Sequence, residues 1–177
     1  MAATQRKMLL RVAAGYRTIS AAAVNVITGV PPIDMLVRGR GRLDALDQVT
    51  EADKRLQRSR TIEEWQTSWE DNTRMAQWTK RLIPNLRPWL ERDFKYTSYY
   101  ITQALSGHGF FKTYTCRIGK ADDEVCLYCQ EMDSPEHTLF SFNRWQRERN
   151  RYETETGEKM SSENSVNNMM KSRENWK

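Results

Sequence analysis

The chain has 177 residues, of which 38% are hydrophobic, 10% aromatic and 29% charged, with a formal net charge of +5. This length fits one domain, or a helical domain with a small appended module, and the aromatic content excludes a fully disordered chain. The three cysteines and the lack of a secretory segment or an apolar run of roughly 18 residues exclude a disulfide framework and a membrane span. We therefore expect an intracellular protein, nuclear or cytoplasmic, whose positive net charge suits a polyanionic partner.

The first 33 residues carry Arg and Lys but no acid. Helical spacing predicts a helix over 5–16, and its buried face is predicted to carry Met8, Leu9, Val12 and Tyr16. Ser20 is a predicted N-cap for a second helix that stops at Gly29. The same composition fits a mitochondrial presequence, but we prefer a core-packed first helix because the segment runs directly into structured-looking sequence.

A third helix is predicted to begin at Ile33, after the turn at Val30-Pro31-Pro32. Its predicted apolar side consists of Ile33, Leu36, Val37, Leu43 and Leu46. Inside it, Arg38-Gly39-Arg40-Gly41-Arg42 places two glycines in a helical pattern, each costing about 1 kcal/mol relative to alanine. The run is either a segment that grips RNA or a solvated, charged helix face.

Residues 44–70 are charge-rich and predicted to be helical, with Trp65 and Trp69 on one face. The series continues with Trp78, Leu82 and Trp89, interrupted by Pro84 and Pro88, and we interpret it as a helical core rather than a base-stacking surface. Residues 99–105 predict another helix, broken by Gly107-His108-Gly109. After Met160 a faint helical signal remains in Val166, Met169 and Met170. The predicted fold is mainly α: an irregular helical domain, a small zinc-knuckle-like module and C-terminal helices.

The sharpest local motif is Cys126-Leu-Tyr-Cys129, followed by His137 after seven intervening residues. Thiolates and imidazole are the ligands that Zn²⁺ prefers, and Cys-x-x-Cys places two sulfurs on one tight turn. Ser134 and Pro135 resemble the cap and first position of a helix, which would set His137 in the first turn. The sequence therefore makes Cys126, Cys129 and His137 candidate zinc ligands.

A structural zinc site needs a fourth ligand, and the position five residues after His137 holds Phe142. Cys116, His108 or an acid would have to substitute. Losing one ligand of four weakens zinc binding severely, so a reduced cysteine pair beside an ordinary histidine fits the same residues.

The sequence contains no recognisable catalytic constellation. Asp122-Asp123 lies in a hydrophilic turn rather than between apolar strands, where paired carboxylates would hold two Mg²⁺ ions. A phosphate loop, Gly-x-Ser-x-Gly and His-Glu-x-x-His are all absent from the sequence. We expect a protein that is not an enzyme.

Several strings together resemble the C-terminal, post-polymerase region of insect-type non-LTR retrotransposon reverse transcriptases. The strings are Gln5-Arg6-Lys7-Met8, Tyr16-Arg17-Thr18-Ile19-Ser20, Gly29-Val30-Pro31-Pro32-Ile33-Asp34, Trp65 to Trp69, Arg81-Leu82-Ile83-Pro84, Leu105-Ser106-Gly107-His108-Gly109, Glu136-His137-Thr138-Leu139-Phe140 and Ser172-Arg173-Glu174-Asn175-Trp176. The resemblance spans nearly the whole chain. It implies a degenerate Cys-Cys-His-Cys knuckle in which Cys126, Cys129 and His137 match the first three ligands and Phe142 departs from the fourth.

The resemblance implies a non-catalytic fragment of a mobile element that binds RNA or DNA non-specifically and accompanies the polymerase portion of the same element. The alternative is an inert structural remnant. The expected divisions are a helical domain over 1–110, the knuckle-like module over 111–145 and a helical tail over 146–177. Cys116 is the proposed substitute ligand, and the proposed nucleic-acid-binding residues are Arg38, Arg40, Arg42, Lys112, Arg117 and Lys120.

Overall fold

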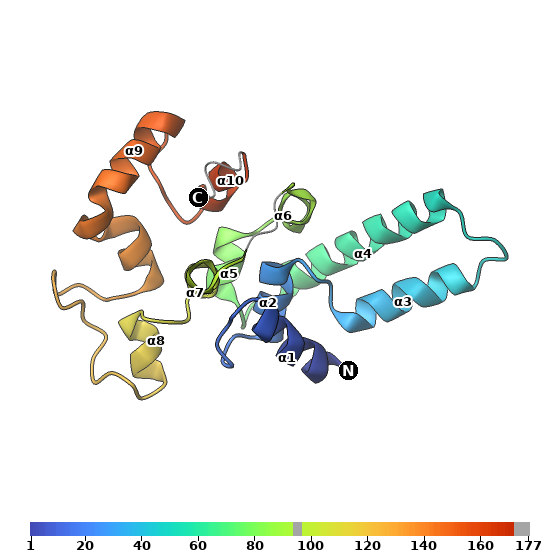
Figure 1. Ribbon diagram of the computed structural model, residues 1–177, viewed down its shortest axis with the longest axis horizontal. Coiled ribbons are helices and arrows are strands. Elements are labelled where there is room, and N and C mark those ends of the chain that lie inside the picture. Colours follow the sequence, from blue (N-terminus) through green and yellow to red (C-terminus); the bar gives the residue numbers. More distant parts are fainter. Residues whose placement is uncertain (94–96, 172–177) are drawn as a thin grey trace.

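The computed structural model describes residues 1–93 and 97–171. Helices make up nearly all of its regular structure (Figure 1). They are α1 (Ala2–Val12), α2 (Ala21–Thr28), α3 (Ile33–Asp44), α4 (Glu51–Asp71), α5 (Gln77–Leu82), α6 (Leu86–Glu91), α7 (Tyr99–Ser106), α8 (Lys112–Arg117), α9 (Gln146–Thr156) and α10 (Ser165–Met169). No strand forms within these two ranges, so the predicted mainly α fold is confirmed. None of the described helices is long and apolar enough to cross a membrane.

The predicted caps of the second helix are confirmed. The Ser20 side chain accepts a hydrogen bond from the Ala23 amide, and Gly29 ends α2 in the left-handed conformation with φ of +69°. Glycine suits this position because it has no Cβ to clash with the backbone. α2 packs against α1 and α7, and its Val24, Val26 and Ile27 are fully buried.

The first helix differs from its predicted bounds and face. It ends at Val12 because Ala14 turns left-handed, with φ of +48°, and the Gly15 amide bonds back to the Leu10 carbonyl at 2.7 Å. This 6→1 bond closes the helix in a Schellman motif. Met8 and Val12 are 61% and 70% exposed, so these two predicted core positions are wrong. Leu9 is buried as predicted, together with Leu10 and Ala13, and Tyr16 packs against the same core.

α3 and α4 form a long helical hairpin that projects from the rest of the chain (Figure 1). The predicted apolar face of α3 is wrong, since Leu36 and Val37 are exposed while Met35 and Gly39 are buried. A Cβ at Gly39 would lie 2.8 Å from the side-chain nitrogen Nε2 of Gln57 in α4. Gly39 therefore lets the two helices approach closely, a role that the sequence analysis had not considered.

The fourth helix begins later than predicted. Residues 45–50 form turns, and α4 starts after Thr50 with a capping box. The Thr50 hydroxyl accepts from the Asp53 amide, and the Asp53 carboxylate accepts from the Thr50 amide at 2.9 Å. Thr50-x-x-Asp53 is a capping-box pattern, and it starts a new helix instead of a continuation of α3.

The two glycines of the Arg-Gly run should respond oppositely to substitution. Gly39→Leu is expected to destabilise the chain by about 1–3 kcal/mol, because the added side chain must displace Gln57. Gly41 has nothing within 4 Å of its added Cβ, so Gly41→Ala should stabilise by about 0.5–1 kcal/mol through helix propensity. Urea unfolding measures both; equal effects at the two positions would argue against close packing at Gly39.

The tryptophan series forms core, as predicted. Trp65, Trp69 and Trp89 are at most 3% exposed, and Trp78 packs against the same cluster from its edge. Pro84 lies between α5 and α6, whereas Pro88 sits in the first turn of α6, where proline is tolerated. The prediction that Pro88 interrupts the helical series is therefore wrong.

The C-terminal part of the chain returns to the helical core. Val166 of α10 is 3% exposed and belongs to the main apolar cluster, with Met169 and Met170 packed against it. Arg81 of α5 pairs with Glu136 at 2.9 Å and with Glu163 at 2.8 Å. The faint helical signal at 166–170 is confirmed by α10, while the Ser172–Trp176 string lies outside the described residues. Contacts thus cross the boundaries that the sequence predicts at 110 and 145.

Candidate metal centre and the surrounding basic residues

A tight turn carries the two cysteines of the motif. An isolated antiparallel bridge joins Val125 to Met132, and the Cys126 amide donates to the Glu131 carbonyl at 2.7 Å. Gln130 closes the turn with φ of +62°, and its amide donates to the Cys126 carbonyl at 3.1 Å. The hairpin therefore holds the two ends of the Cys-x-x-Cys turn together without any strand.

The histidine lies at the start of the helix that follows, as predicted. The Ser134 hydroxyl accepts from the His137 amide at 3.1 Å, and helical structure begins at Pro135. The helix widens into a π-turn over His137–Ser141, in which the Phe142 amide donates to the His137 carbonyl at 2.8 Å. Single π-turns inside helices occur frequently at functional sites.

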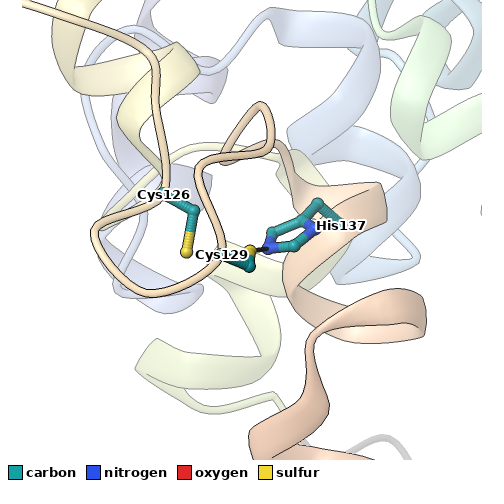
Figure 2. A group of neighbouring side chains, drawn as sticks. All are labelled: Cys126, Cys129 and His137. Carbon is teal, nitrogen blue, oxygen red and sulfur yellow. Dashed lines mark hydrogen bonds between the residues drawn. The ribbon is translucent and has the colours of Figure 1, made fainter.

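Cys126, Cys129 and His137 point toward one another (Figure 2). Their ligand atoms all lie within 4.8 Å of one another, and Cys129 Sγ is 3.3 Å from His137 Nε2. A tetrahedral Zn²⁺ with bonds of about 2.0–2.3 Å separates its ligand atoms by roughly 3.5–3.8 Å. The three side chains could therefore hold a metal ion with only small movements.

The surroundings favour a thiolate at one cysteine. Amide hydrogen bonding from Tyr128 and Cys129, with a contribution from His137, lowers the pKa of Cys126 to about 7 against the opposing effect of burial. The Glu131 amide lowers the pKa of Cys129, but burial and the neighbouring Cys126 outweigh it, so that pKa is raised overall. One thiol of the pair is thus prepared for deprotonation, which metal binding requires.

Glu131 lies on the far side of the histidine from the cysteines. Its carboxylate lies 3.0 Å from His137 Nδ1, although the geometry is not that of a hydrogen bond. The other ring nitrogen, Nε2, faces Cys129. A carboxylate behind a metal-binding histidine fixes its tautomer and raises its basicity. Sequence reasoning missed Glu131; its position two residues after the Cys-x-x-Cys turn was the available signal.

The residues considered for the fourth ligand lie in different places. The Phe142 ring is 5.6 Å from the His137 ring and 5.5 Å from the Tyr128 ring, so this position does border the cluster. Cys116 is half-buried in α8 and is not part of the group of three. His108 is also outside that group, and its ring bonds to the Ser106 carbonyl and to Arg117.

The arginines of the Arg-Gly run are engaged by acids. Arg38 pairs with Asp34 and, at a longer distance, with Glu64; Arg42 lies 2.6 Å from Glu64. Arg40 pairs with Asp44 at 2.9 Å. These pairs are exposed, so each contributes little to stability, yet they offset the positive charge of the face.

The basic residues near the cysteine turn are arranged differently. Lys112 pairs with Asp123 at 2.8 Å. Arg117 stands 5.4 Å over the Tyr114 ring and has no carboxylate partner among the described residues. Lys120 is exposed two residues before the Asp122-Asp123 turn. Arg117 and Lys120 are therefore the more available cations of the predicted set.

Comparison with known proteins gives no match: no family model fits the chain, and no curated protein or solved structure is significantly similar to it.

Proposed function

We propose that this chain is a non-catalytic nucleic-acid-binding region, of the kind that follows the polymerase domain in non-LTR retrotransposon reverse transcriptases. The observation that carries the proposal is the assembly of Cys126, Cys129 and His137 into one group, with Glu131 behind the histidine. Zn²⁺ is the metal that this sulfur and nitrogen donor set prefers. Its role here is to fix the turn and the following helix relative to each other.

The proposed contact surface lies beside this group and comprises Lys112, Arg117 and Lys120. Arg117 and Lys120 have no ion-pair partner among the described residues, and Lys112 alone is paired, with Asp123. Cations that lack an acidic partner release counterions from phosphates most effectively, which favours this surface over Arg38, Arg40 and Arg42, all of which are ion-paired. Contacts to phosphates carry no sequence information, so binding should be salt-dependent and non-specific.

Fluorescence anisotropy with a labelled oligonucleotide over a range of salt concentrations tests the proposal. Changing Lys112, Arg117 and Lys120 together to Gln is expected to reduce the slope of log affinity against log salt by about 2, as for three lost phosphate contacts on a single strand. The matched variant with Arg38, Arg40 and Arg42 changed to Gln should keep the natural slope. A chain that binds no oligonucleotide at low salt would refute the proposal.

One observation favours the alternative of an inert remnant. Phe142 stands where the resemblance implies a fourth ligand, and its ring fills the space beside His137. Under this alternative the purified chain would hold no zinc and bind no nucleic acid, whereas the preferred function requires zinc that is lost on Cys126→Ser.

A further inference from the structure

A cavity of about 400 Å³ lies between α5, the end of α7 and α8. Its lining includes Arg74, Trp78, Gly107, His108 and Arg117. Volumes of roughly 300–1,000 Å³ are typical of sites for small molecules and cofactors. The three cysteine and histidine ligands are not part of this lining, although Pro135, at the start of the helix that carries His137, is.

The aromatic wall of the cavity is fixed in place. The Trp78 indole N–H donates to the Ala104 carbonyl at 2.7 Å, and Phe140 packs at 6.2 Å between ring centroids. Gly107 contributes backbone only: a Cβ there would be 3.0 Å from Trp78 Cδ1 and 3.3 Å from Pro135. The hydrogen bond to Ala104 and the close packing of Gly107 therefore hold the indole in one orientation at the wall of the cavity.

His108 presents hydrogen-bonding groups to the cavity in a defined tautomer. His108 Nδ1 lies 2.8 Å from the Ser106 carbonyl, so this nitrogen carries the proton, and Nε2 accepts from the Arg117 guanidinium at 3.3 Å. Burial, helped by the neighbouring Arg117, lowers the pKa of His108. The imidazole is neutral at pH 7, and its ring centroid lies 4.7 Å from that of Tyr114 with a tilt of 56° between the two rings.

Two guanidinium groups supply the charge. Arg74 and Arg117 both line the cavity, and no carboxylate pairs with either of them in the part of the chain that the structure describes. Other arginines, such as Arg81 and Arg87, are held in ion pairs. Uncompensated guanidinium groups beside an aromatic wall match a ligand with a flat ring and a phosphate.

From this arrangement we infer that the cavity binds one unpaired nucleotide of a single strand, with its base against Trp78 and its phosphate between Arg74 and Arg117. A base in a duplex is stacked and paired, so its face cannot enter a cavity between helices. The inference deepens the proposed function and rests on it: it makes the nucleic acid single-stranded. It also adds Arg74, Trp78 and His108 to the contact residues.

The test compares a labelled pyrimidine 12-mer with its duplex by anisotropy, using the whole chain. Stacking of one base on an aromatic side chain contributes about 1–3 kcal/mol, so the single strand should bind at least about fivefold more tightly than the duplex. Arg74→Gln with Arg117→Gln should remove that preference. The matched control, Arg55→Gln with Arg58→Gln, removes the same charge from exposed positions on α4 and should retain it.

Competition identifies what the cavity recognises. Uridine monophosphate should displace the labelled strand at a concentration at which inorganic phosphate does not. Equal displacement by phosphate would mean a simple anion site and overturn the inference, as would equal weakening of strand and duplex in the Arg74/Arg117 variant. Those outcomes leave non-specific nucleic-acid binding intact. A chain that binds no oligonucleotide at low salt would instead refute the proposed function, and this inference with it.

Discussion

A Phe142→Cys variant is expected to bind Zn²⁺ roughly 100-fold more tightly than the natural chain. Four-ligand structural sites bind with about 10–16 kcal/mol in total, so one further thiolate contributes about 3 kcal/mol. The position is suitable because Phe142 follows the π-turn directly and its ring already borders those of His137 and Tyr128. Competition with a chromophoric chelator measures the affinity, and the absorption of bound Co²⁺ reports the added sulfur.

Two controls separate the thiolate from the loss of the ring. Phe142→Ala removes the ring without supplying a ligand and should give no increase in affinity. Cys126→Ser combined with Phe142→Cys should return the affinity to about that of the natural chain, because three ligands remain. An unchanged affinity in the single Phe142→Cys variant would show that position 142 cannot reach the metal.

Trp69→Ala is expected to destabilise the chain by about 3–5 kcal/mol. Trp69 is 2% exposed, belongs to the main apolar cluster and donates its indole N–H to the Ile83 carbonyl at 2.9 Å. Truncation leaves both a large cavity and an unpaired buried carbonyl. Since typical domains have only about 5–15 kcal/mol of stability, urea unfolding should show a much lower midpoint.

Trp145→Ala is the matched control, because this indole is 42% exposed and lies outside the apolar cluster. Its effect should stay within about 0.5 kcal/mol. Trp69→Phe should fall between the two, since it retains most of the volume and loses the hydrogen bond. A Trp69→Ala midpoint equal to that of Trp145→Ala would contradict the core described here.

Elements with strong end signals were predictable from the sequence. Ser20 and Gly29 bound α2, and Gly107 ends α7 in the left-handed conformation, as their residue types indicate. Ser134 and Pro135 correctly placed His137 at a helix start. In each case the information is local, so a few neighbouring residues determine the backbone geometry.

The faces of helices and the contacts between distant segments were not predictable in this way. Periodicity placed Val37 inside and did not reveal that Gly39 faces Gln57, because that depends on the partner helix. The cavity brings Arg74 together with Arg117, which lie 43 positions apart in the sequence. The cysteine and histidine group was accessible because its three members fall within 12 consecutive residues, 126–137.

The return of α10 to the core determines how the chain would tolerate a break. The link over 118–124 is largely exposed, whereas Val166 on its far side is buried among side chains from the N-terminal helices. Arg81, which precedes that link, also forms ion pairs with Glu136 and Glu163, which follow it. A chain cut there by a protease would remain a non-covalent pair of fragments, because each piece holds part of one shared interior.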